Sequence, residues 1–185
     1  MKYRIAFVFI FFFLPLTVLA QGRYYLTKTG EINFEASVAS FEEVKAKNSN
    51  VSAILNSDNG EFAALALMKG FRFKVALMEE HFNENYIESS KFPKATFNGK
   101  IKDFEFSQLS ELPNEYIVAG TITMHGVDKL IEVPAIIFIV HNVISMKLRF
   151  TLRPEDFNIE IPKIVSSKIA EEIDVLANFS LRKPN

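Results

Sequence analysis

The sequence predicts a mainly β protein, namely an eight-stranded antiparallel barrel with one short helix. Apolar and polar residues alternate with a period of two in many short segments, as in strands that bury one face. Turn signals separate these segments, and strand and helix patterns do not alternate along the chain, which argues against a parallel α/β sheet. The interior of a barrel of about eight strands is either filled by side chains or holds one small or elongated ligand. The pattern alone leaves both alternatives open.

Five segments show the strict alternation, so each is expected to turn one face toward the interior. They are residues 31–38, 43–47, 96–102, 144–153 and 172–181. Three further segments are apolar on both sides and are expected to be covered on both faces or to lie at a closing seam. These are residues 62–68, 116–124 and 133–140. Pro134 within the last run predicts an edge position or a bulge, because proline has no N–H to donate to a neighbouring strand.

Turns and one helix are predicted between these strands. Residues 57–60, residues 112–114 and His125-Gly126 carry turn signals. Residues 76–86 place Leu77, Met78, His81 and Phe82 on one helical stripe. Residues 165–172 are a weaker helix candidate and otherwise a loop.

The N-terminus has the layout of a secretory signal peptide. Lys2 and Arg4 precede an uncharged apolar run over residues 5–19, and cleavage is expected after Ala20. An uncleaved anchor is the weaker alternative, because a membrane span usually needs about 18 apolar residues or more. The sequence therefore predicts a periplasmic or secreted protein with one domain over residues 21–185 and no transmembrane segment after cleavage.

Charge and composition exclude several classes of function. Removal of residues 1–20 takes away two basic residues, which leaves 19 Lys and Arg against 22 Asp and Glu and a net charge of −3. That balance does not suit a nucleic-acid partner. Cysteine is absent, which excludes disulfides, thiolate metal sites and a thiol nucleophile.

No pattern of catalytic or metal-binding residues stands out. His81, His125 and His141 lie in separate predicted elements, whereas a zinc site needs at least three ligands in one small volume. The sequence has no nucleophile elbow and no glycine-rich phosphate loop. We therefore expect no catalytic residue, no metal and no cofactor, and a hydrolase is the least favoured alternative.

Two motifs carry a resemblance to a known family. Residues 120–129, Gly-Thr-Ile-Thr-Met-His-Gly-Val-Asp-Lys, resemble the hairpin signature of the YceI-like family of periplasmic lipid-binding proteins. Residues 91–97, Lys-Phe-Pro-Lys-Ala-Thr-Phe, resemble its second signature, and His81-Phe82 loosely resembles a His-Leu pair ahead of it. The similarity runs from about Tyr24 to Leu181. Two features depart from the family: residues 31–34 lack its His-Ser pair, and Leu130 stands where proline commonly follows the lysine.

The resemblance implies a lipocalin-like barrel whose long apolar cavity takes a polyisoprenoid or a similar amphiphilic lipid. By similarity, the cavity wall comes from inward-facing positions. These are Phe34, Phe71, Phe73, Phe97, Met146, Phe150 and Phe179. The alternative is a filled barrel that acts as an interaction module, in which residues 133–140 form a face for a protein partner or for a homodimer.

Overall fold

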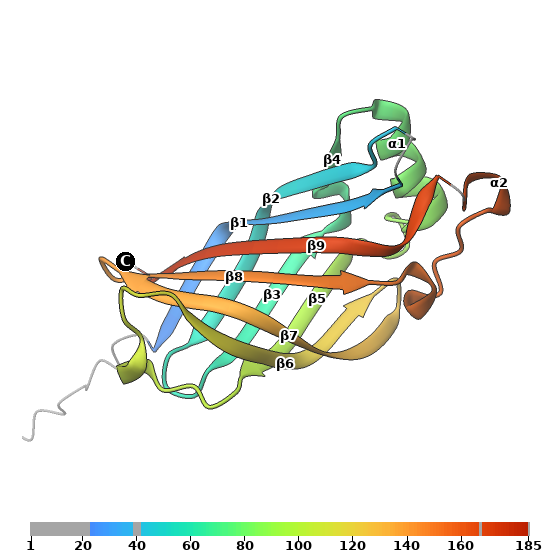
Figure 1. Ribbon diagram of the computed structural model, residues 1–185. Helices are drawn as coiled ribbons and strands as arrows, with labels where there is room; N and C mark the ends of the chain where they lie inside the picture. The colour runs from blue at the N-terminus through green and yellow to red at the C-terminus, as the bar shows by residue number, and fades with distance from the viewer. Residues whose placement is uncertain (1–22, 39–41, 167, 185) are drawn as a thin grey trace, which may run out of the picture.

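The computed structural model describes residues 23–38, 42–166 and 168–184, and the predicted signal peptide lies outside them. Eight strands close into one antiparallel barrel in the order β1-β9-β8-β7-β6-β5-β3-β2, with β2 pairing back to β1 (Figure 1). This confirms the predicted fold class. The barrel strands are β1 (Tyr24–Ser37), β2 (Lys45–Asn56), β3 (Glu61–Leu67), β5 (Lys94–Ile101), β6 (Asn114–Met124), β7 (Val127–Val140), β8 (Val143–Leu152) and β9 (Ile169–Arg182).

Strand β2 is longer than the alternation over residues 43–47 predicted. Polar residues 48–50 interrupt the pattern. The strand continues nevertheless, because the buried side chain of Asn48 has hydrogen-bond partners within the protein. Its side chain is buried, its Nδ2 donates to the carbonyl oxygen of Leu67 at 3.0 Å, and its Oδ1 accepts from the backbone N–H of Asn50 at 3.0 Å. Beyond this point Val51 and Leu55 again face the interior and are fully buried.

Short helical segments gather at one end of the barrel (Figure 1). After β3 the chain forms the turn η1 (Met68–Gly70) and the short strand β4 (Arg72–Phe73), which pairs with the start of β2. The helix α1 (Ala76–His81) and the π-helical turn η2 (Phe82–Tyr86) follow, which confirms the helix predicted over residues 76–86. A second helix, α2 (Lys163–Ser166), overlaps only the start of the weaker candidate over residues 165–172. Most of that candidate was wrong, because β9 begins at Ile169 and pairs with β1 and β8.

The wall of the barrel opens between β7 and β8 at this same end. β7 pairs with β6 from Val127 onward, but its pairing with β8 begins only at Ala135, directly after Pro134. The edge position predicted for Pro134 is therefore confirmed. The 3₁₀ segment η4 (Pro154–Phe157) packs against β7 and β9 at this opening, and its Phe157 is completely buried.

The opposite end of the barrel is filled by side chains. Leu55, Ile101, Val118, Ile144 and Leu181 come from five different strands, and none of them is exposed to solvent. The turn η3 (Phe106–Gln108) lies at this end, where the Phe106 ring packs against the Tyr25 ring with 5.7 Å between centroids. The barrel therefore has one closed, packed half and one half covered by helical segments.

Candidate functional site

The half of the barrel near α1 and α2 contains an apolar cavity of about 430 Å³. Inward-facing residues of the strands form its wall, and α1, η2 and the segment from η4 to α2 cover it. The wall includes Ile32, Phe34, Ala66, Ile122, Phe150 and Val175. The cover includes Met78, Phe82, Ile159 and Val165. The volume and the apolar lining are typical of a site for a small or single-chain ligand.

Four phenylalanine rings form an aromatic cluster at one side of this cavity. Phe34 of β1 lies 5.4 Å from Phe71, 5.7 Å from Phe73 and 5.6 Å from Phe82, measured between ring centroids. Phe82 in turn lies 5.8 Å from Phe71 and 5.2 Å from Phe73. Tilted and edge-on pairs at such distances contribute about 0.5–1.5 kcal/mol each beyond area burial. The cluster thus attaches the helical cover to the barrel wall.

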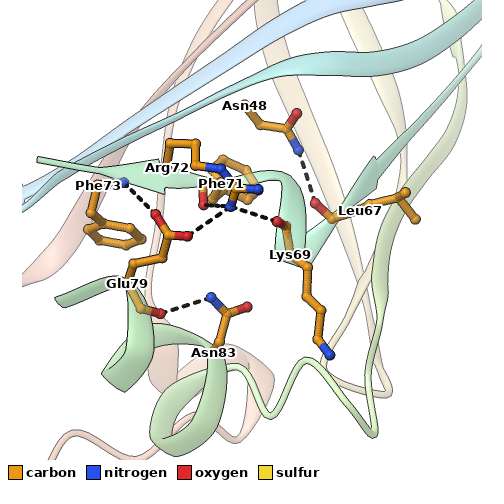
Figure 2. Close-up of polar contacts among 8 residues, drawn as sticks. All are labelled: Asn48, Leu67, Lys69, Phe71, Arg72, Phe73, Glu79 and Asn83. Atoms are coloured by element: carbon orange, nitrogen blue, oxygen red, sulfur yellow. Dashed lines mark hydrogen bonds and ion pairs between the residues drawn. The ribbon is translucent and has the colours of Figure 1, made fainter. Parts of the chain in front are cut away.

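Polar contacts of Glu79 hold the short strand β4 against this cover (Figure 2). Its carboxylate accepts from the Arg72 guanidinium at 2.8 Å and from the backbone N–H of Phe73 at 3.1 Å. Asn83, one turn later, donates from Nδ2 to the backbone carbonyl oxygen of Glu79 at 2.8 Å. Glu79, a helix residue that does not itself line the cavity, therefore helps to position Phe71 and Phe73.

Charged and polar side chains touch the cavity at its rim. Arg153 is the best defined: its Nη2 and Nε donate to Oε1 of Glu172 at 2.6 and 3.1 Å. This hydrogen bonding to the Glu172 carboxylate raises the pKa of the Arg153 guanidinium above its ordinary value. Glu42, His81 and Lys168 also reach the cavity. The site therefore offers an apolar interior for a chain and a polar rim of mixed charge for a polar end group.

The seven predicted wall residues divide into two groups. Phe34, Phe71, Phe73 and Phe150 line the cavity. Met146 and Phe179 belong to the packed interior of the barrel, where they are 1% and 4% exposed, and Phe97 is partly buried and packs against this core. Contact of each with a ligand stays a prediction.

The sequence reasoning missed the residues that cover the cavity. Met78 and Phe82 were visible on the helical stripe of residues 76–86, but this stripe alone does not show which face meets the barrel opening. Ile159 and Val165 lie in a region without a periodic pattern and gave no comparable signal.

The histidines are well separated in the fold. His81 reaches the cavity rim, while His125 and His141 lie in the turns before β7 and after it, with φ of 52° and 48°. Within residues 23–38, 42–166 and 168–184, no three His, Asp or Glu side chains are grouped so that they could hold a metal ion. In the same part of the chain, no helix combines the length and apolar character required to cross a membrane.

A closed eight-stranded antiparallel barrel with an apolar cavity at one end defines a lipocalin-like barrel protein. The chain belongs to the YceI-like domain family, whose sequence model matches residues 25–181. This confirms the family resemblance of the two motifs. No curated protein matches the chain by sequence.

Several solved structures share this fold. A polyisoprenoid-binding domain from Saccharophagus degradans, implicated in plant cell wall breakdown, has 15% identity and a TM-score of 0.74, with 88% of this chain and 99% of that chain covered. BcnA from Burkholderia cenocepacia has 15% identity and a TM-score of 0.68, with 82% of this chain and 95% of that chain covered. The YceI protein of Campylobacter jejuni has 18% identity and a TM-score of 0.61, with 80% of this chain and 89% of that chain covered. At such identities the similarity concerns the fold.

Proposed function

We propose that this protein binds the apolar chain of a lipid in its cavity and carries out no catalysis. The observation that supports this most directly is the apolar cavity of about 430 Å³, bounded by Phe34, Phe71, Phe73 and Phe150. A barrel of the same fold is described as a polyisoprenoid-binding domain, which makes a prenyl or acyl chain a reasonable ligand class.

Burial of the chain supplies the binding free energy in this proposal. Transfer of each methylene from water into an apolar site is worth about 0.8 kcal/mol, so ten methylenes give a gross gain of about 8 kcal/mol. Association and ordering costs reduce this gain. The gain itself requires no precise set of polar contacts, which agrees with the absence of a sharp polar motif in the sequence.

The site chemistry favours binding over catalysis. The cavity lining is mostly apolar, and Arg153 at its rim is already engaged by Glu172. The signal-peptide pattern of residues 1–20 supports a periplasmic or secreted location for this binding protein.

The alternative of an interaction face on residues 133–140 receives less support. Val133, Ala135 and Ile137 are buried in the barrel interior, so every second residue of this apolar run serves the core. We therefore do not propose this run as a partner or dimer face.

Native mass spectrometry of residues 21–185, purified from a secreting host, tests the proposal. The expected result is a discrete added mass that organic extraction removes and that returns after incubation with prenyl or acyl lipids. A polypeptide that stays bare before extraction and after incubation with both lipid classes would overturn the proposed function.

A further inference from the structure

The cavity ends partway down the barrel. On β3, Ala66 lines the cavity but Phe62, four residues away on the same face, does not. On β5, Ala95 lines it but Phe97 does not, and on β9 the change occurs between Val175 and Phe179. The barrel interior therefore changes from hollow to filled at the same depth on three strands.

Three rings meet at this depth, and we call Phe62, Phe97 and Phe179 the aromatic floor. The centroid of the Phe62 ring lies 5.4 Å from that of Phe179, in an edge-on arrangement, and 6.0 Å from that of Phe97. Phe62 and Phe179 are almost completely buried. One ring thus joins the other two across the barrel.

Glycines in the surrounding strands provide the space for the floor. A Cβ atom at Gly30 would lie 2.6 Å from Cδ1 of Phe179, closer than atoms can approach. Cβ atoms at Gly99 and Gly120, which pair with each other across β5 and β6, would each lie 2.7 Å from Cζ of Phe97. Glycine inside a strand commonly marks such a close approach. The backbone is therefore shaped to seat these rings.

We infer that the aromatic floor limits the length of the chain that the cavity can bury. This inference rests on the proposed lipid-binding function. The cavity of about 430 Å³ above this floor has the size of a site for one small ligand, so a chain that enters it can be buried only as far as the floor. The ligand class that fits is a lipid with a single apolar chain, such as a fatty acyl or short prenyl chain. The remainder of a longer chain stays outside the cavity in water.

A chain-length series tests this limit. Saturated fatty acids of increasing length, kept below their micelle concentrations, compete with the fluorescent probe anilinonaphthalene sulfonate for the full mature protein. Affinity should rise about fourfold per added methylene while the chain is still entering the cavity. It should then level off at the length at which the chain end reaches the floor, because further methylenes gain no burial.

Variants of the floor provide the second arm of the experiment. Phe97→Leu and Phe179→Leu each shorten a floor side chain. Each should therefore increase the chain length at which affinity levels off, which we call the break. Phe104→Leu is the matched control, because Phe104 is buried beside Gly60 and lies outside both the cavity lining and the floor. It should leave the break in place.

The outcomes separate this inference from the function on which it rests. Failure of every chain to compete would overturn the proposed function itself. Binding that strengthens steadily up to 20 carbons in the wild-type protein would overturn the length limit, whether or not the variants fold. A break that stays at one length in folded Phe97→Leu and Phe179→Leu proteins would show that these rings do not set it.

Discussion

The His125 imidazole lies between two hydrogen-bond acceptors. Its Nε2 is 3.0 Å from Oε2 of Glu88, and its Nδ1 is 2.9 Å from the backbone carbonyl oxygen of Phe157. The ring also packs on Phe92 with 4.3 Å between centroids. One side chain therefore joins the turn between β6 and β7 to the segment after η2 and to η4, which packs at the opening beside the cavity.

Removal of this ring should destabilise the protein. His125→Asn keeps a residue that tolerates the positive φ of this turn but loses the ring that contacts Glu88, Phe157 and Phe92. We expect a loss of about 2–3 kcal/mol in the free energy of unfolding, measured by urea denaturation. The exposed His81→Asn variant is the control and should change stability by less than about 0.5 kcal/mol. Equal stability of the two variants would contradict this role for His125.

Phenylalanines of the wall and of the floor should respond differently to truncation. Phe179→Ala removes a buried ring packed on Phe62 and Gly30, so we expect a loss of about 3–5 kcal/mol without ligand. Phe150 borders the cavity, so Phe150→Ala should cost less stability in the lipid-free protein but weaken lipid binding. Thermal denaturation after organic extraction, together with lipid titration, measures both effects. The opposite order of stability losses would argue for a filled barrel.

The glycine pair beneath Phe97 should not accept a larger side chain. A Cβ at Gly120 would lie 2.4 Å from the backbone carbonyl oxygen of Asn98 and 2.5 Å from Cα of Gly99. Because both neighbours are backbone atoms, Gly120→Ala must move the β5–β6 pair apart and should cost about 1–3 kcal/mol. Chemical denaturation measures this cost. An unchanged free energy of unfolding would contradict the close packing of these strands.

Tyr25 should make stability depend on pH in the alkaline range. Burial raises the pKa of its phenol above the ordinary value of 10.0, so the fold favours the neutral form. This contribution is fully present below pH 10 and is lost as the pH rises through the pKa of the folded state. Wild-type stability should therefore fall above pH 10 more steeply than that of Tyr25→Phe. Parallel pH profiles of the two proteins in urea denaturation would refute this prediction.

The sequence was sufficient for the fold because alternation reports which face of a strand is buried. It identified the inward positions of Phe34 and Phe150 as well as those of Phe97 and Phe179. Alternation does not report depth along the barrel axis, however. Whether an inward residue borders the cavity or fills the floor depends on neighbours from other strands, such as Gly30 beneath Phe179.

The boundaries that the sequence missed also depend on distant contacts. β2 continues through its polar stretch because Asn48 bonds to Leu67 on the other side of the β2–β3 turn. The segment around Ile159 covers the cavity because η4 packs against the part of β7 that precedes Pro134, where Lys129 pairs with Asp156. Neither contact is visible in a local pattern.

The position of a lipid chain inside the barrel can be measured directly. Nuclear Overhauser effects between an isotope-labelled palmitate chain and the protein locate each methylene. We expect contacts from the chain to the rings of Phe34 and Phe150, and none to Leu55 or Ile101 in the packed half of the barrel. Contacts confined to the outer surface, or no contacts at all with bound palmitate, would contradict binding inside the barrel.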